Sequence, residues 1–560
     1  MKLNKLNIVV MTTIAMICSC SDDQLNIENP NNLSADSFWS TENDVQQGLI
    51  ATYAALQLDG LFGGSSATQH PVRSDTGRPN NWNANAIGLN KLAFNENSDI
   101  VKKRWRDCYI GIYRANQVLV NLDKIDLSVS TKNQIEAEAR FLRGFFYYSL
   151  YRGYNGGSVI IHTTVPESSD DFYKSPSPAE DVYNLILSDL EFAYNNLPEQ
   201  YDNNQDIGRA TWGAATAMLG KLHINEHDYG VARNKFKEIL DSNLYSLTPN
   251  IGDNFDEDHE MNSESIFEVA FSTELKQGTS NGAADGPLGS EASSRARILA
   301  TVQGGGYRTI MPSYNMTMLF KNDVMDINNP INATRTGTSN YSIRTSMSIA
   351  IADDDNSTLY QRPSNEGGGY NNFEASYLKK FQNWTLFTES DQSISGINER
   401  AIRLADIKLL YAECLLQSEN SVGEAIEQVN DIRQRAGVVL LNSVDYDPES
   451  LMEHIMWVER PLELMFEGHD TRWEDLTRWD KVQEQYNRLA SKRYVLIQKN
   501  LFEYDSNTHN HVEPPNCGGN NQPPCIIKEF EDAASSYQPG THNYFPIPST
   551  EQNSNPDLFN

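Results

Sequence analysis

The sequence has few basic residues for its acidity. Among 560 residues, Lys and Arg number 45 whereas Asp and Glu number 75, so the formal net charge at pH 7 is −30. Nucleic-acid phosphates require a basic face on their partner, and an anionic lipid surface repels a strongly acidic protein. The composition therefore argues against nucleic acid as a partner and favours neutral or cationic ligands.

Long hydrophobic runs are absent after the N-terminus. No later stretch approaches the roughly eighteen consecutive apolar residues that a membrane-spanning helix needs. The apolar run from Ile8 to Ile17 is too short for that purpose, and Lys2 and Lys5 precede it. This pattern is typical of a secretory signal peptide. We predict that residues 1–19 are this signal.

The signal ends in a short motif that contains Ser19 and Cys20. It resembles the lipobox of bacterial lipoproteins, in which the cysteine is acylated and becomes the mature N-terminus. We expect lipidation of Cys20, with residues 20–33 as a polar tether from the lipid to the folded body. A plain signal peptide cut nearby remains the alternative.

Cysteine is scarce, with six residues in the whole chain. Cys108 and Cys414 lie in helical patterns and are expected to be small buried residues. Cys517 and Cys525 bracket a turn rich in glycine, asparagine and proline, so a disulfide between them is expected outside the cytoplasm. His509 and His511 leave a zinc site open as the alternative, although their spacing matches no standard finger.

Motifs for catalysis are missing as well. The chain contains no nucleophile elbow, no zinc-protease helix and no phosphate-binding glycine loop. Glu459 with Glu463, or the run 353–355 of three aspartates, could act as paired carboxylates, but nothing in the sequence selects them. The acidic stretch 253–260 lacks the pattern of a calcium-binding EF-hand loop and is expected to be a solvated loop, without metal. We predict no enzymatic activity and no cofactor.

Helical periodicity dominates two parts of the chain. Strong helical patterns run from Trp105 to Leu122, Thr131 to Tyr154 and Pro178 to Asn196. Residues 209–241 and 400–435 each read as a pair of helices with small residues at close-packing positions, and their length approximates a tetratricopeptide unit. Such hairpins must stack to bury their apolar faces. We predict a mostly α fold, with a tetratricopeptide-like scaffold built mainly from residues 34–245 and 398–480.

The remaining segments have a different composition. Residues 59–100, 250–397 and 485–545 are rich in glycine, serine, threonine and asparagine, and short extended pieces appear at 265–271 and 376–381. We predict that they form a loop-rich layer with short strands, supported by the helices, and that residues 34–560 form one domain. Loops on a rigid scaffold often carry binding sites.

Aromatic residues in these loops are the candidates for binding a sugar. An exposed aromatic face stacks on a sugar ring, and nearby amides, carboxylates and guanidiniums bind its hydroxyls. The candidate residues are Asp75, Arg78, Trp82, Tyr307, Arg308 and Trp384, with Tyr370 as a weaker one. For each tryptophan or tyrosine, the alternative is that the ring only holds its own loop in place.

Several motifs in a fixed order resemble the SusD/RagB lipoproteins of Bacteroidota, which are outer-membrane nutrient-binding proteins. The motifs are Ser37-Phe38-Trp39, Arg114-Ala115-Asn116-Gln117, Glu138 to Gly144, Gly208-Arg209-Ala210-Thr211, Arg403 to Ile407, Ile432 to Gly437, Glu459-Arg460-Pro461-Leu462-Glu463-Leu464, Asp475-Leu476-Thr477-Arg478-Trp479 and Phe545-Pro546-Ile547-Pro548. A further motif is Phe466-Glu467-Gly468-His469. The charged residues Arg460, Glu463, Glu467, Arg472 and Arg478, in or beside these motifs, lie among apolar residues, so we expect them to form a buried network.

The resemblance implies a function. Such proteins capture oligosaccharides at the cell surface and deliver them to a SusC-type TonB-dependent transporter in the outer membrane, to which they are anchored by lipid. Asp22-Asp23, directly after Cys20, looks like the acidic signal that sends these lipoproteins to the cell surface. The family is not enzymatic. A peptide-capturing lid of the RagB type, a surface glycan hydrolase and a scaffold without a ligand of its own remain the alternatives.

Overall fold

The computed structural model describes residues 38–559, except 65–67, 276–290, 336–340, 365–373, 391–393, 469, 498–499 and 505–525. The helices are α3 (Glu42–Ala54), α5 (Ala84–Asn90), α6 (Asp99–Leu122), α7 (Val129–Gly153), α8 (Ala179–Asn196), α9 (Trp212–Asn225), α10 (Tyr229–Ser242), α11 (Arg295–Leu299), α12 (Tyr314–Lys321), α13 (Ile343–Ser348), α14 (Leu404–Glu419), α15 (Val422–Ala436), α16 (Pro448–His454), α17 (Arg460–Leu464), α18 (Thr471–Arg478), α19 (Val482–Ser491), α20 (Glu531–Ser536), α21 (Pro539–His542) and α22 (Ser549–Ser554). The strands are β1 (Gly77–Pro79), β2 (Ser265–Val269), β3 (Ile310–Pro312), β4 (Ile349–Ile351), β5 (Thr358–Leu359), β6 (Arg362–Pro363), β7 (Ser376–Leu378), β8 (Glu399–Arg403), β9 (Tyr494–Ile497) and β10 (Asn500–Glu503).

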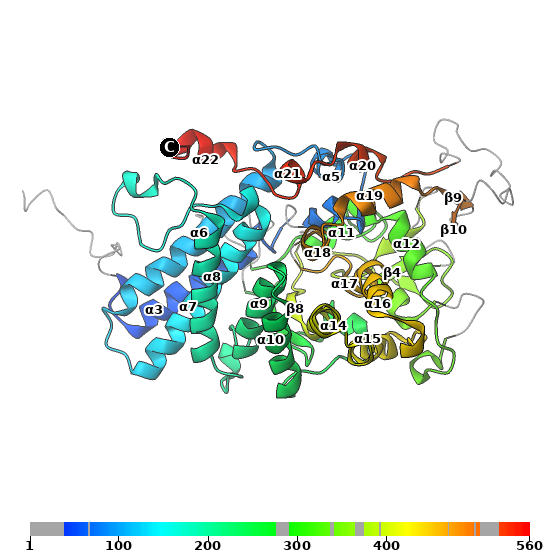
Figure 1. Ribbon diagram of the computed structural model, residues 1–560, viewed down its shortest axis with the longest axis horizontal. Coiled ribbons are helices and arrows are strands. Elements are labelled where there is room, and N and C mark those ends of the chain that lie inside the picture. The colour runs from blue at the N-terminus through cyan, green and yellow to red at the C-terminus, as the bar shows by residue number, and fades with distance from the viewer. Residues whose placement is uncertain are drawn as a thin grey trace, which may run out of the picture.

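The long helices stack on one another nearly in chain order (Figure 1). Helix α3 packs on α6, α6 on α7, α7 on α8, α8 on α9, and α9 on α10. Helix α10 then packs on α14, and α14 on α15, although residues 243–403 separate α10 from α14 in the sequence. The stack is therefore continuous in space, and residues 243–403 form an insertion between two of its neighbouring helices. This arrangement confirms the prediction of a mostly α fold in which helical hairpins stack.

The helix boundaries follow from local capping chemistry. At the start of α3, the Thr41 side chain accepts a hydrogen bond from the Asp44 amide, and the Asp44 carboxylate accepts one from the Thr41 amide, which makes a capping box. Helix α10 ends at Asn243 and α15 at Gly437, both in the left-handed conformation that asparagine and glycine tolerate best.

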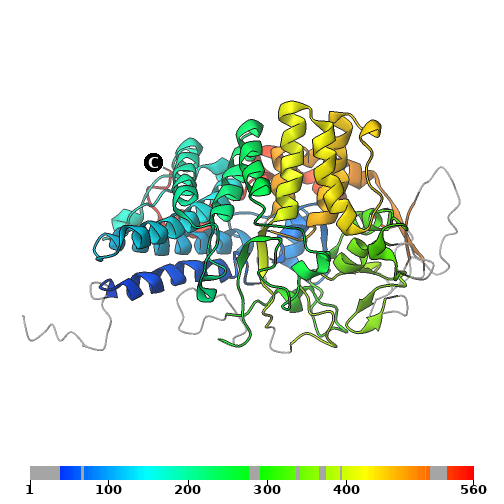
Figure 2. The same cartoon turned by 90° about the horizontal axis from the view of Figure 1, so that it is seen from below.

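The inserted segment forms a layer of loops, short strands and short helices against the stacked helices. Figure 2 shows it below the row of green and yellow helices that includes α10, α14 and α15. The described strands pair only in twos, as β1–β3, β2–β8, β4–β7, β5–β6 and β9–β10, all antiparallel. Helices α5, α11, α12 and α13 also lie in segments predicted to be loop-rich, so these segments are more helical than their composition indicates.

The main hydrophobic core joins the two predicted scaffold blocks. It includes Leu142 of α7, Leu219 of α9 and Leu415 of α14, which are at most 2% exposed. Phe545 and Leu558, near the end of the chain, belong to the same core. Within the part of the chain that the structure describes, no helix combines the length and the apolar character that crossing a bilayer would require.

Candidate functional site

A three-residue strand pair brings two distant loops together. Strand β1 runs antiparallel to β3, with Arg78 opposite Met311. Beyond the strands, the Asn80 amide donates to the Thr309 carbonyl at 2.9 Å, and the Asn80 side chain donates to the Arg308 carbonyl at 3.0 Å. The loop that carries Trp82 is thereby fixed beside the loop that carries Tyr307 and Arg308.

The glycine triplet 304–306 allows the second loop to turn sharply. Gly305 has a φ of +80°, and a Cβ atom on Gly306 would overlap Ala300. Arg308 follows with a φ of +51°, a left-handed conformation that is unfavourable for a residue with a side chain. Hydrogen bonds to Ala300 and Asn80 hold Arg308 in this conformation. The backbone there is fixed by its neighbours rather than by its own preference.

Two guanidinium groups converge on one buried carboxylate. Glu374 is 5% exposed and forms ion pairs with Arg78 and, at 3.3 Å, with Arg308. The Arg78 guanidinium also lies 4.4 Å from the ring centroid of Tyr314, at the start of α12. Glu374 neutralises one of their two positive charges and orients the N–H donors of both arginines.

Two aromatic side chains of the same two loops are exposed to solvent. Trp82 is 58% exposed and Tyr307 is 46% exposed. Trp82 lies in the short loop between the end of β1 at Pro79 and the start of α5, which the Asn83 side chain caps by accepting a hydrogen bond from the Ala86 amide. Large exposed aromatic rings beside oriented donors are the elements that a saccharide site needs.

A third loop, residues 383–390, adjoins this surface. Its Glu389 amide donates to the Gly304 carbonyl at 2.8 Å. Leu386 and Phe387 in this loop are 55% and 60% exposed, and the sequence analysis did not single them out. The site therefore comprises residues 78–83, 302–308 and 384–389, with Glu374 beneath; we call it the loop-layer site.

Trp384 has a different environment from Trp82. It is only partly exposed and packs on a small buried cluster that includes Tyr360. The Lys379 ammonium lies 3.4 Å from a ring centroid of Trp384, and the Tyr360 amide donates to its carbonyl. These contacts favour the alternative for Trp384, in which its ring holds its own loop in place rather than stacking on a sugar.

Asp75 requires a correction. It is 1% exposed, and both of its carboxylate oxygens accept hydrogen bonds from Arg472 at 2.8 Å. The Gln485 side chain donates to the same carboxylate. A sugar hydroxyl cannot reach this group, so Asp75 is a structural residue rather than a ligand-binding one.

The charged residues of the sequence motifs form the expected buried network, with partners partly in the other motifs and partly in segments outside them. The contacts are Arg460 with Asp406 and Asp475, Glu463 with Arg344, Arg403 and Arg435, Glu467 with Lys380 and Arg403, Arg472 with Asp75, and Arg478 with Glu413 and Asp475. Glu459 and Glu463, considered above as a carboxylate pair, both contact Arg344. Each of these two carboxylates is buried, and their pKa values lie below the ordinary range.

The acidic stretch 253–260 brings Asp253, Asp256 and His259 within reach of one another. Within this group, His259 forms an ion pair with Asp256 at 2.9 Å. Cys20, Tyr370, His509, His511, Cys517 and Cys525 lie outside the described residues. The described cysteines Cys108 and Cys414 are buried and free, as predicted.

Comparisons with known proteins give the family. The SusD family model matches residues 263–560, and a second model, described as starch-binding associating with outer membrane, matches residues 23–224. SusD-like protein P25 of Formosa agariphila is 25% identical over 493 residues, which cover 84% of this chain and 89% of that protein.

Solved structures agree with this result. A SusD superfamily protein of Bacteroides vulgatus superposes with a TM-score of 0.73 at 24% identity, covering 93% of this chain and 98% of the other. A laminarin-binding SusD-like protein superposes with a TM-score of 0.69 at 21% identity, with the same coverage. The chain belongs to the SusD family.

Proposed function

We propose that this protein binds a neutral oligosaccharide at the loop-layer site, without cleaving it. The observation that carries the proposal is the β1–β3 pair, which joins the loop of exposed Trp82 to the loop of exposed Tyr307, while Arg78 and Arg308 from the same segments share the Glu374 carboxylate. The aromatic rings stack on the apolar face of a sugar, and the guanidiniums donate to its hydroxyls. The description of the second family model and the laminarin-binding neighbour both support a carbohydrate ligand.

The charge of the chain narrows the ligand class. A net charge of −30 repels acidic glycans, and Glu374 offsets the local positive charge of the two arginines. Neutral glucans, fructans, mannans or xylans fit this electrostatic field. Because few contacts are available, a dissociation constant of about micromolar or weaker is expected.

We further propose that acylated Cys20 anchors the protein in the outer membrane, at the cell surface, and that it delivers its ligand to a SusC-type transporter. The signal-like N-terminus and membership of the SusD family support this location. Affinity for an oligosaccharide in the micromolar range suits capture followed by release, since a tighter complex would hold the sugar back from the transporter.

Affinity gel electrophoresis of residues 21–560 tests the binding function. Gels would contain laminarin, starch, xylan or alginate, and casein hydrolysate would serve as a competing peptide source. We expect a neutral glycan to retard the protein without hydrolysis, and Trp82→Ala or Tyr307→Ala to weaken binding at least tenfold, about 1.4 kcal/mol. Phe559→Ala, at an exposed aromatic residue near the chain end, is the matched control.

Three outcomes would overturn the proposal. Retardation by no glycan at all would favour a scaffold without a ligand, and competition by peptides would favour the RagB-type lid. Release of sugar from the gel polysaccharide by the purified protein would make it a hydrolase.

A further inference from the structure

A cavity lies far from the loop-layer site. It has a volume of about 400 Å³ and is enclosed by α6, the segment 160–173 and α22. In Figure 1 these elements lie toward the left end of the molecule, whereas α12, which packs on Arg78, lies toward the right. Its volume falls within the roughly 300–1,000 Å³ of ligand-binding cavities. We call it the α6–α22 cavity.

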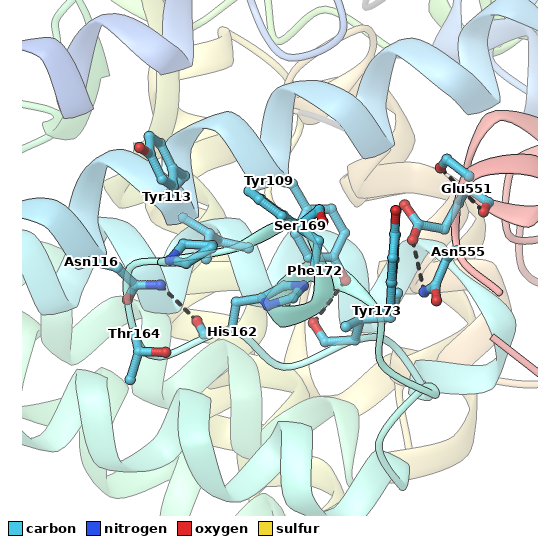
Figure 3. Close-up of a pocket in the computed structure, with 14 residues that line it drawn as sticks. Tyr109, Tyr113, Asn116, His162, Thr164, Ser169, Phe172, Tyr173, Glu551 and Asn555 are labelled. Carbon is cyan, nitrogen blue, oxygen red and sulfur yellow. Dashed lines mark hydrogen bonds between the residues drawn. The ribbon is translucent and has the colours of Figure 1, made fainter. Parts of the chain in front are cut away.

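Aromatic rings form much of its wall (Figure 3). The ring of His162 lies edge-on to Tyr109, with centroids 5.9 Å apart, and 6.4 Å from the ring of Phe172. Phe172 is 50% exposed and Tyr113 is 39% exposed, so both rings offer free surface. Phe172 is held in place because it ends a 3₁₀ turn, Ser169–Phe172, that a capping box fixes. Both rings therefore present an apolar face on which a ligand can stack.

The polar groups of the cavity are fixed and mostly neutral. The Asn116 side chain donates to the His162 carbonyl at 2.8 Å and accepts from Arg143 at 2.8 Å. At the other end of the cavity in Figure 3, the Asn555 side chain donates to Glu551 at 3.0 Å. These bonds occupy the amide groups of the two buried asparagines and fix the shape of the wall, so a ligand meets a pre-organised surface.

The charge in the cavity is of one sign. Its lining contains one carboxylate, that of Glu551, and neither lysine nor arginine. Burial, together with nearby Lys174, lowers the pKa of His162 to about 4, so the imidazole is neutral at pH 7 and offers one donor and one acceptor. Within the described residues, neither ring nitrogen of His162 has a protein hydrogen-bond partner. Such a cavity repels phosphate, sulfate and uronic acids but accepts hydroxyl groups.

We propose that the α6–α22 cavity is a second saccharide site, which takes a neutral sugar unit on the exposed rings of Phe172 and Tyr113. The Glu551 carboxylate and the His162 imidazole bind its hydroxyls. A ring of hydroxyls, amides and one carboxylate around an aromatic wall suits a sugar better than an apolar peptide side chain. The inference rests on the proposed function, because the ligand belongs to the same chemical class.

Two sites on one chain act together on a long polymer. When one site holds a segment of a polysaccharide, the other meets its neighbouring segments at a raised effective concentration. A short oligosaccharide cannot span the molecule and gains nothing from this arrangement. The second site therefore strengthens binding of polymer, with little effect on the affinity of the loop-layer site for a hexasaccharide.

The test compares polymer and oligosaccharide. Laminarin in affinity gels and laminarihexaose in titration calorimetry are the probes, followed by the starch and xylan series if laminarin does not bind. We expect the double variant Tyr113→Ala/Phe172→Ala to weaken polymer binding about fivefold or more and to leave hexasaccharide binding at the loop-layer site intact. Both rings are exposed, so the variant is expected to fold, and its thermal unfolding is compared with that of the parent chain.

The reciprocal variant separates this inference from the proposed function. In Trp82→Ala, we expect residual weak retardation by polymer, which Tyr113→Ala/Phe172→Ala then removes. If the Tyr113→Ala/Phe172→Ala variant binds polymer as well as the parent chain does, the proposal of a second site is overturned and the proposed function is not. Retardation by no neutral glycan overturns both proposals, and displacement by casein hydrolysate that depends on Phe172 makes the cavity a peptide site instead.

Discussion

Arg472 binds Asp75 across 397 residues of sequence through two hydrogen bonds of 2.8 Å. The fork of the guanidinium matches both carboxylate oxygens, the most specific geometry for this pair. Burial alone would raise the pKa of Asp75, but the Arg472 charge and its hydrogen bonds lower it below the ordinary value. The pair fixes the segment just before β1 to α18, and so fixes the base of the loop-layer site.

Replacement of Asp75 by asparagine should therefore be strongly destabilising. Asp75→Asn leaves the Arg472 charge buried without its counter-charge, which typically costs about 3–5 kcal/mol. Since the native pKa is depressed, the ion pair contributes fully above the unfolded pKa of about 4 and its contribution is lost as pH falls below it. Urea unfolding of both proteins at pH 7 and at pH 3.5 would show the difference shrinking at the lower pH.

The exposed pair Lys237–Asp241 provides the control, because its side chains are 51% and 63% exposed. Asp241→Asn should change the free energy of unfolding by less than about 1 kcal/mol. Equal effects of the two substitutions would contradict the structural role of Asp75.

Glu374 should determine which glycans the site accepts. Glu374→Gln removes the negative charge that Arg78 and Arg308 share. Without it the two guanidiniums are less well oriented, so we expect affinity for a neutral glycan to fall roughly tenfold. The uncovered positive charge should at the same time increase retardation by alginate. Affinity gels with both polymers measure the two effects, and a parallel loss for both polymers would indicate only local unfolding.

The buried amine of Lys379 should make the free energy of unfolding increase as the pH rises above 7. Lys379 is 1% exposed and donates to the Ser346 carbonyl at 2.7 Å, and burial lowers its pKa to about 7. The unfolded chain, with a pKa near 10.4, binds the proton more tightly, so stability rises with pH between these two values.

Lys379→Met removes this buried amine, so its gain in free energy of unfolding over the parent chain should be larger at pH 7 than at pH 9.5. The gain should change by up to about 3 kcal/mol between the two pH values. Urea unfolding at the two pH values measures this difference. Lys237→Met, at a side chain 51% exposed, is the control and should show little change. A difference that is constant with pH would mean that Lys379 is charged in the folded protein throughout this range.

Close packing of α6 on α7 depends on Gly111. A Cβ atom at this position would overlap the ring of Phe146, which is fully buried. Gly111→Ala should destabilise the protein by about 1–3 kcal/mol through overpacking. Gly230, in the first turn of α10, has no atom within 4 Å of such a Cβ. Gly230→Ala should be neutral or stabilising by up to about 1 kcal/mol, and chemical denaturation distinguishes the two.

The stacked helices were predictable because their apolar residues repeat at helical spacing over long segments. Helices α5 and α12 were not, since each has eight residues or fewer and begins at a cap, Asn83 or Ser313, within a polar segment. Short helices of this kind depend on tertiary contacts more than on local propensity.

The site was predictable only in part. Trp82 and Tyr307 were recognisable as large aromatic residues in polar, glycine-rich loops. The sequence does not predict that β1 pairs with β3. Each strand has three residues, too few to show an alternation that would identify a partner more than 230 residues away. For the same reason, the sequence does not predict the contact of Glu374 with Arg78 and Arg308. Nor does it predict that Asp75 pairs with Arg472 rather than with a ligand.

The end of the chain returns to the first helices. Phe545 is fully buried, its carbonyl accepts a hydrogen bond from Asn155, and Glu551 accepts one from Trp105 of α6. A chain that is synthesised or threaded through a channel from its N-terminus thus cannot complete this part of its core until residues 545–551 have emerged. Until then, helices α6 and α7 lack the packing and hydrogen bonds that this segment contributes.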